Sequence, residues 1–192
     1  MVKIGITGGI GSGKSVVATL LSLSGVPVYI ADVESKRLTN DSPLIRERLT
    51  ALLGPDIYTD EGVDKKLLAS YIFHDATLLR KVNQIIHPEV NRHFLAWAEK
   101  QSSPFCAIES AILFESGFDK VVDTCLMVYA PLSLRVQRVV DRDKVSPIEV
   151  ERRIRNQMSD EEKRERSDYV IYNDNSRALI PQIHAFIEWL RP

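Results

Sequence analysis

The sequence predicts an α/β fold in which a five-stranded parallel sheet is flanked by helices. One observation is a set of short, nearly continuous apolar runs, which is typical of strands covered on both faces. These runs are residues 2–7, 26–30, 105–108, 124–128 and 169–172. A second observation is the helical periodicity between the runs, since strands that alternate with helices indicate a parallel sheet. The third is a glycine-rich segment directly after the first run.

Composition and length agree with one globular core that carries an insertion. Of the 192 residues, 44% are hydrophobic and 27% are charged, which are ordinary values for a globular protein. The net charge of -1 argues against a general nucleic-acid binder. No apolar run reaches the roughly 18 residues of a membrane span, and the start of the chain does not resemble a leader peptide. We therefore expect a cytoplasmic protein without nucleic-acid or membrane partners, with Cys106 and Cys125 as buried free thiols.

Residues 8–15 read G-G-I-G-S-G-K-S, a complete phosphate-binding loop between a predicted strand and a predicted helix. Glycines let the backbone approach a ligand closely, and its N–H groups then form an anion-binding concavity. Lys14 suits the β- and γ-phosphates, and the Ser15 hydroxyl suits Mg²⁺. The residues expected to bind the nucleotide here are Gly9, Ile10, Gly11, Ser12, Gly13, Lys14, Ser15 and Val16.

A carboxylate, Asp32, follows the second predicted strand. In open α/β sheets, ligands bind at the carboxyl ends of the strands. If this strand neighbours the first, Asp32 lies close to the phosphate loop and could accept the proton of an acceptor hydroxyl. Its position fits equally well an N-cap of a helix over residues 33–38. Glu109 and Glu115 are weaker candidates of the same kind.

Residues 41–103 contain no convincing strand and are predicted to form a helical insertion. Ser42 is expected to cap a helix that begins at Pro43. Further helices are expected over residues 64–73, 76–86 and 88–100. In a phosphoryl-transfer enzyme, such an insertion would bind the acceptor, and the alternative is a helical layer without a ligand. The nucleotide-binding core would then comprise residues 1–40, 104–133 and 167–192.

Residues 134–166 are rich in arginine and are predicted to form a lid. The segments 146–149 (S-P-I-E) and 159–162 (S-D-E-E) match capping boxes, so helices should meet at a polar joint near residues 143–146. Arg138 and Arg142 are four residues apart on one helix face, where guanidinium groups could bind the transferred phosphoryl group. Acidic residues in the same window leave open a solvated helix pair, and we expect two or three of the arginines to be functional.

Segments from almost the whole chain resemble the dephospho-CoA kinase family. Residues 4–15 (I-G-I-T-G-G-I-G-S-G-K-S) resemble its opening segment almost letter for letter. The other matching segments are 31–32 (A-D), 83–88 (N-Q-I-I-H-P), 112–115 (I-L-F-E), 153–158 (R-I-R-N-Q-M) and 167–173 (S-D-Y-V-I-Y-N). The sequence departs from the family pattern at Ile30, where the family has the first aspartate of D-A-D, and at Ala111, where it has proline.

The resemblance implies a P-loop kinase fold and a phosphotransferase. The reaction would transfer the γ-phosphate of ATP to the ribose 3′-hydroxyl of dephospho-CoA, the last step of coenzyme A synthesis. The implied roles are Asp32 as catalytic base, Lys14 and Ser15 at the phosphates and Mg²⁺, Arg138 and Arg142 in the lid, Asn173 near the adenine, and His87, Phe114 and Glu115 facing the acceptor. Because Ile30 replaces an aspartate, the catalytic role would fall on Asp32 alone.

Other functions remain open on the sequence alone. A nucleoside monophosphate kinase would share the fold, because function depends on the site rather than on the fold. A GTPase-like switch is disfavoured because no segment resembles the guanine-specifying N-K-x-D run, and a DNA-acting ATPase is disfavoured by the acidic balance. The oligomeric state stays open between a monomer and a weak homo-oligomer.

Overall fold

The protein is described by a computed structural model over residues 1–73 and 75–191. The chain divides into two compact units, Met1–Ile30 with Lys100–Pro192, and Ala31–Glu99. The second unit therefore includes the helix directly after the second strand, which the sequence interpretation assigned to the core. No helix in the described part of the chain is both long and apolar enough to cross a bilayer.

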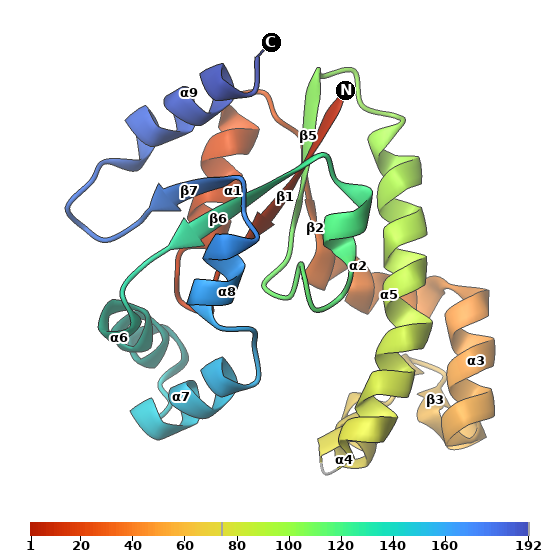
Figure 1. Ribbon diagram of the computed structural model, residues 1–192. Helices are drawn as coiled ribbons and strands as arrows, with labels where there is room; N and C mark the ends of the chain where they lie inside the picture. The colour runs from red at the N-terminus through yellow and green to blue at the C-terminus, as the bar shows by residue number, and fades with distance from the viewer. Residues whose placement is uncertain (74, 192) are drawn as a thin grey trace. The chain divides into compact units, whose positions relative to one another are not determined.

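The first unit contains a five-stranded parallel sheet, as predicted (Figure 1). Its strands are β1 (Val2–Thr7), β2 (Val28–Ile30), β5 (Phe105–Glu109), β6 (Thr124–Tyr129) and β7 (Tyr169–Tyr172), in the order β2-β5-β1-β6-β7. The expectation that the second strand could neighbour the first is wrong. Strand β1 is central and both of its edges are occupied, by β5 and β6, so β2 pairs with β5 instead.

Two helices, α1 (Lys14–Leu23) and α9 (Leu179–Trp189), lie on the same side of this sheet (Figure 1). They bury a continuous apolar cluster against the strands, and each fully buried aliphatic side chain contributes about 1.5–3 kcal/mol. Its members include Ile4, Ile6, Val17, Leu21, Leu126, Val128, Ile171, Ile183 and Phe186. Cys106 and Cys125 are free and buried, as predicted, and burial raises the pKa of Cys125 to about 12.

The arginine-rich segment forms three helices, α6 (Leu132–Asp143), α7 (Pro147–Arg155) and α8 (Asp160–Glu165), and a short 3-10 helix η2 (Phe118–Val121) precedes β6. The predicted capping box at Ser159 is complete. The one at Ser146 is half formed: its hydroxyl accepts from the Glu149 N–H, but the Glu149 carboxylate binds Arg153 at 2.5 Å instead of returning to the cap. Lys144, at the joint between α6 and α7, has a left-handed backbone conformation.

The second unit is mainly helical. It contains α2 (Ala31–Asp41), α3 (Pro43–Leu53), the 3-10 helix η1 (Pro55–Ile57), α4 (Lys65–Phe73) and α5 (Ala76–Ala98). Ser42 caps α3 as predicted, because its hydroxyl accepts from the Ile45 N–H at 3.4 Å. The expected absence of strands is wrong: β3 (Tyr58–Thr59) pairs antiparallel with β4 (Gly62–Val63). Two-residue strands are too short to leave an alternating apolar pattern.

The two helices expected over residues 76–86 and 88–100 are one helix, α5, with Pro88 inside it. Proline removes one backbone N–H and usually ends or kinks a helix. Here one apolar face continues across the proline at helical spacing. The buried residues of that face are Val82, Ile86, Val90 and Phe94. Their burial stabilises the helix on both sides of Pro88 and outweighs the single lost hydrogen bond.

Candidate active site

The phosphate loop joins β1 to α1, and its shape depends on glycine at particular positions. Gly11 and Gly13 have φ of +79° and +93°, which side chains rarely adopt. A Cβ at Gly11 would also lie 2.5 Å from the Arg135 carbonyl oxygen, and one at Gly13 would overlap the Asn173 amide. These two positions therefore admit no other residue without a change in the loop.

Lys14 and Ser15 form the first turn of α1, directly behind the loop. The Lys14 side chain is buried and its Nζ lies 3.4 Å from the Gly9 carbonyl oxygen. Ser15 is exposed, and Val16 is 52% exposed. The first turn contains no acidic residue, so the positive end of the helix dipole is not neutralised by a side chain there. Backbone N–H groups, a buried ammonium group and a helix N-terminus converge on one place, which suits phosphate.

A magnesium ion at this place would have few protein ligands. Within residues 1–73 and 75–191, no group of three or more His, Cys, Asp or Glu side chains could hold a metal ion. Magnesium keeps several water ligands and is commonly held by one or two protein oxygens and substrate phosphates. The exposed Ser15 hydroxyl at the start of α1 supplies one such oxygen.

Asn173, at the end of β7, lies against the phosphate loop. Its backbone N–H donates to the Tyr129 carbonyl at 2.8 Å, and its side-chain amide donates to the Ser12 carbonyl, also at 2.8 Å. Arg138 lies beside it: Nη2 donates to the Asn173 carbonyl at 3.1 Å and to Asn175 Oδ1 at 2.8 Å. The structure thus brings Asn173 and Arg138 together at the Ser12 side of the loop.

Arg142 lies elsewhere, at the joint between α6 and α7. Its side chain is 64% exposed, and its Nε lies 2.7 Å from Asp143 Oδ1. The same carboxylate binds Arg153 at 3.1 Å. The hydrogen bond from Arg142 holds the pKa of the Asp143 carboxyl below its usual value. Arg142 and Arg138 share a helix face, as predicted, but their partners here differ.

Sequence reasoning missed the arginine that touches the loop, Arg135. It is 2% exposed, and its Nη1 donates to the Ile10 carbonyl at 3.4 Å. Gln157 is a second missed contact: its side-chain oxygen accepts from the Ile10 N–H at 3.2 Å. A signal existed for Arg135, because residues 135, 138 and 142 follow the i, i+3, i+7 spacing of one helix face. No sequence signal indicated Gln157 as a partner of Ile10.

Glu109 ends β5 and is the buried carboxylate of the strand beside β1. It is 7% exposed and stands in register with Ile6 of β1 on one side and Ile30 of β2 on the other. Side chains of paired residues in a sheet project to the same face. The sequence offered several acidic residues at or after the end of a strand. Among them, Glu109 ends the strand that pairs directly with β1, which leads into the phosphate loop.

A profile of the dephospho-CoA kinase family matches residues 2–178. The chain belongs to that family. The resemblance in its sequence motifs is thereby confirmed. A dephospho-CoA kinase of Bacteroides fragilis is 52% identical over 190 residues, which cover 98% of this chain and 93% of that protein.

Solved structures share the fold of this chain. The crystal structure of TT1252 from Thermus thermophilus has a TM-score of 0.85 and 35% identity, and the match covers 100% of this chain and 98% of that one. A shikimate kinase from Acinetobacter baumannii has a TM-score of 0.55 and 19% identity over 99% of this chain and 93% of its own. The latter likeness shows the fold alone and confirms the predicted P-loop kinase architecture.

Two of the residues implied by the family motifs lie in the first unit and already have partners there. The Arg166 guanidinium lies over the Phe114 ring, and its central carbon is 4.4 Å from the ring centroid. Glu115 Oε1 accepts from the Met158 N–H at 2.8 Å and lies 3.3 Å from Lys163 Nζ. These contacts connect the segment after β5 to α8 and to the residues before it.

The other two, Asp32 and His87, lie in the second unit. Asp32 is exposed in the first turn of α2, which begins at Ala31. Because the helix starts one residue before it, Asp32 is not the N-cap, and the capping alternative is wrong. His87 is half-buried within α5 next to Pro88, and burial lowers its pKa.

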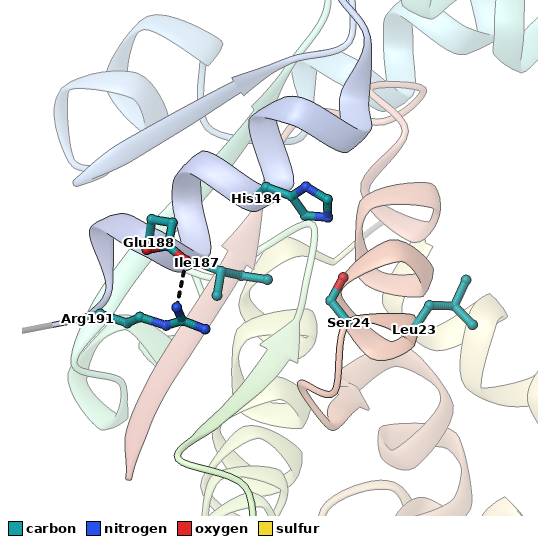
Figure 2. Close-up of a pocket in the computed structure, with 6 residues that line it drawn as sticks. All are labelled: Leu23, Ser24, His184, Ile187, Glu188 and Arg191. Carbon is teal, nitrogen blue, oxygen red and sulfur yellow. Dashed lines mark hydrogen bonds and ion pairs between the residues drawn. The ribbon is translucent and has the colours of Figure 1, made fainter.

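A hollow of about 390 Å³ lies at the opposite end of α1 from the phosphate loop (Figure 2). It is lined by Leu23, Ser24, His184, Ile187, Glu188 and Arg191, and the last two form an ion pair at 2.6 Å. Because α1 rises about 1.5 Å per residue, its two ends are about 14 Å apart. This hollow is therefore separate from the phosphate site.

Proposed function

We propose that the protein transfers the γ-phosphate of ATP to the ribose 3′-hydroxyl of dephospho-CoA, giving coenzyme A and ADP in the final step of coenzyme A synthesis. The observation that carries this proposal is a phosphate loop with its buried Lys14, in a chain that belongs to the dephospho-CoA kinase family over residues 2–178. A cytoplasmic location follows from an acceptor and a donor that are both soluble metabolites. The enzyme works as a monomer or a weak homo-oligomer.

The phosphate loop binds the donor. Backbone N–H groups of residues 9–16 surround the β- and γ-phosphates, and Lys14 places a positive charge beside them. The Ser15 hydroxyl would hold a magnesium ion that arrives with the nucleotide, and this ion would supply charge neutralisation of the phosphates. Asn173, held against Ser12, borders the adenine. Because the transition state spreads negative charge over the phosphoryl oxygens, these fixed positive groups stabilise it.

The acceptor hydroxyl needs a base, and we assign this role to Asp32. It follows β2 by two residues and its carboxylate is exposed, as a group that receives a substrate proton must be. We assign His87, Phe114 and Glu115 to the acceptor side, because their segments resemble the motifs of the family. Arg138 and Arg142 belong to a lid that covers the phosphates and excludes water, which would otherwise hydrolyse ATP.

The decisive experiment measures ADP release from Mg²⁺-ATP with dephospho-CoA, AMP, CMP or no acceptor. We expect release with dephospho-CoA only, and a product that carries a 3′-phosphate by mass spectrometry and NMR. Release with AMP or CMP would move the assignment to nucleotide kinases. Release that ignores every acceptor would indicate a hydrolase or a switch.

The base assignment has its own test. Asp32→Asn should lower kcat by about 100- to 10,000-fold, because a positioned general base contributes that much, and should leave Mg²⁺-ATP affinity within about threefold. Stopped-flow or quench kinetics and calorimetric titration separate the two quantities. Turnover at the wild-type rate would remove Asp32 from the chemistry, and Glu109→Gln in parallel would then examine the carboxylate on β5.

A further inference from the structure

A buried ion pair lies directly against the phosphate loop. The Arg135 guanidinium, in the first turn of α6, binds the Asp160 carboxylate at the start of α8. It also donates to the Ile10 carbonyl oxygen at 3.4 Å. Only 3% of the Arg135 side chain is exposed, and a guanidinium removed from water needs partners on its charged edge. The arginine is therefore held between the loop and α8.

Gly9 shows how close this contact is. A Cβ at residue 9 would overlap Nη1 of Arg135 and lie 2.8 Å from Asp160 Oδ1. Gly9 does not have the left-handed φ of Gly8, Gly11 and Gly13. Its backbone conformation is therefore open to other residues. The requirement for glycine at this position comes from the paired side chains of Arg135 and Asp160 rather than from the backbone.

Both polar groups of the Ile10 backbone, its carbonyl and its N–H, form hydrogen bonds with side chains. Its carbonyl accepts from Arg135, and its N–H donates to Gln157 Oε1 at 3.2 Å. Gln157 follows α7 and precedes α8, whereas Arg135 belongs to α6. Side chains from both ends of the arginine-rich segment therefore hold the same residue of the loop.

One turn further along α8, a second side chain anchors the helix. Lys163 is fully buried, and its Nζ donates to the Ala111 carbonyl at 2.7 Å and lies 3.3 Å from the Glu115 carboxylate. Because Lys163 fixes α8 to the segment after β5, Asp160 has little freedom to withdraw from Arg135. Loop, α6, α8 and the segment after β5 thus form one connected set of contacts.

We propose that Arg135 is a positioning residue for phosphoryl transfer, which keeps Gly9 and Ile10 in the conformation that receives the nucleotide phosphates. The kinetic consequence rests on the proposed function, whereas the consequence for nucleotide affinity does not. A loop ordered beforehand loses less conformational entropy on binding. It also keeps the γ-phosphate in line with its acceptor, and a displacement of about 1 Å can lower a rate about 100-fold.

The test compares Arg135→Lys, Arg135→Ala, Gly9→Ala and the double variant Gly9→Ala/Arg135→Ala. Arg155→Ala is the matched control, because that side chain on α7 is 72% exposed and faces Glu151 at 3.9 Å. Four quantities are measured for each: the calorimetric affinity for a Mg²⁺-bound, non-hydrolysable ATP analogue, kcat with dephospho-CoA, KM for dephospho-CoA, and the melting temperature.

For Arg135→Lys, which keeps the charge but loses the forked contact, we expect kcat and nucleotide affinity to fall by about tenfold or more. The KM for dephospho-CoA should stay within about threefold and the melting temperature within a few degrees. Arg155→Ala should match the wild type in all four quantities. Wild-type affinity and kcat in a folded Arg135→Lys protein would overturn the proposal.

The double variant tests the contact itself. Gly9→Ala should weaken nucleotide binding by about tenfold in the wild-type background and by less than about threefold once Arg135 is alanine. In that background the Arg135 atoms that the new methyl group would overlap are gone, and the Asp160 side chain is no longer held in place by its arginine partner. An equal loss in both backgrounds would overturn the proposal. If Arg135→Ala does not fold, Gly9→Ala in the Arg135→Lys background gives the same comparison. The nucleotide affinities could change as expected in a protein that makes no coenzyme A. That result would refute the proposed function but not the role of Arg135 in positioning the loop.

Discussion

The two ends of α6 carry arginines in opposite environments. Arg135 lies in the first turn of the helix, has 3% of its side chain exposed and is paired with Asp160. Arg142 lies in the last turn, has 64% of its side chain exposed and is paired with its neighbour Asp143. They are seven residues apart, which is about two turns on one face. The phosphate loop and α8 cover the first end, and the joint to α7 leaves the second in solvent. Helical spacing identifies a shared face but not which part of it becomes buried.

This difference in burial decides what each arginine contributes. A buried pair is coupled to the packing around it, so the loss of one partner leaves an uncompensated charge. An exposed pair is screened by water and salt and contributes little to stability. Arg135 is therefore expected to act on the fold and on the loop, whereas the exposed pair of Arg142 with Asp143 costs little to break, as the proposed lid role of Arg142 requires.

The largest expected effect is on stability. Arg135→Ala should lower the free energy of unfolding by about 3 kcal/mol, because Asp160 is left buried without its partner. Replacing both residues at once, as Arg135→Met with Asp160→Leu, should restore much of the loss, since no charge then remains buried. Urea denaturation followed by circular dichroism measures each variant. A double variant less stable than Arg135→Ala would show that the pair is a net source of stability.

How far the sequence predicts these features depends on how local their causes are. The first strand, the loop and α1 were predicted because capping, glycine and apolar spacing act within about twenty residues, and the same holds for the Ser42 and Ser159 caps. The partner of β2 was wrong because strand order depends on which strands compete for the edges of β1.

In the candidate site, Lys14 contacts Gly9 and Asn173 contacts Ser12, both in the phosphate loop. The roles of Lys14 at the phosphates and of Asn173 near the adenine stay predictions. Arg135 was missed because its partners lie 125 and 25 residues away along the chain, at Ile10 and Asp160. Residue spacing carries no information about contacts at that separation. A similar reason applies to α5, where tertiary burial kept a helix continuous through a proline.

A smaller effect on stability is expected at the exposed end of α6. Arg142→Ala should change the free energy of unfolding by less than about 1 kcal/mol. As a lid arginine it should nevertheless lower kcat by about 100-fold, because one donor to the developing phosphoryl charge has that weight. Arg155→Ala on the neighbouring helix serves as the control for a solvated arginine. Equal kcat values for the two variants would assign Arg142 to the solvated surface.

The smallest expected effect concerns the pKa values of the two carboxyls that pair with these arginines, Asp160 and Asp143. Their titration compares the two ends of α6 most directly. Burial raises the pKa of Asp160 above its usual 3.8, with Arg135 opposing the shift, whereas the hydrogen bond from Arg142 lowers the pKa of Asp143 below 3.8. The signs for stability are therefore opposite. The contribution of Asp160 is complete below pH 3.8 and is lost as the pH rises through its raised pKa; that of Asp143 is complete above pH 3.8 and is lost as the pH falls through its lowered pKa.

Carboxyl ¹³C NMR titration of the intact protein measures both values directly. Asp160 should titrate above Asp143, and Arg142→Ala should bring Asp143 back towards its usual pKa while leaving Asp160 unchanged, since the two carboxyls have separate arginine partners. If Asp160 instead titrates below Asp143, the attraction of Arg135 outweighs the loss of hydration at the buried end. The Arg135–Asp160 pair would then stabilise the fold above pH 3.8. The charge pairs at both ends of α6 would in that case both contribute stability at neutral pH.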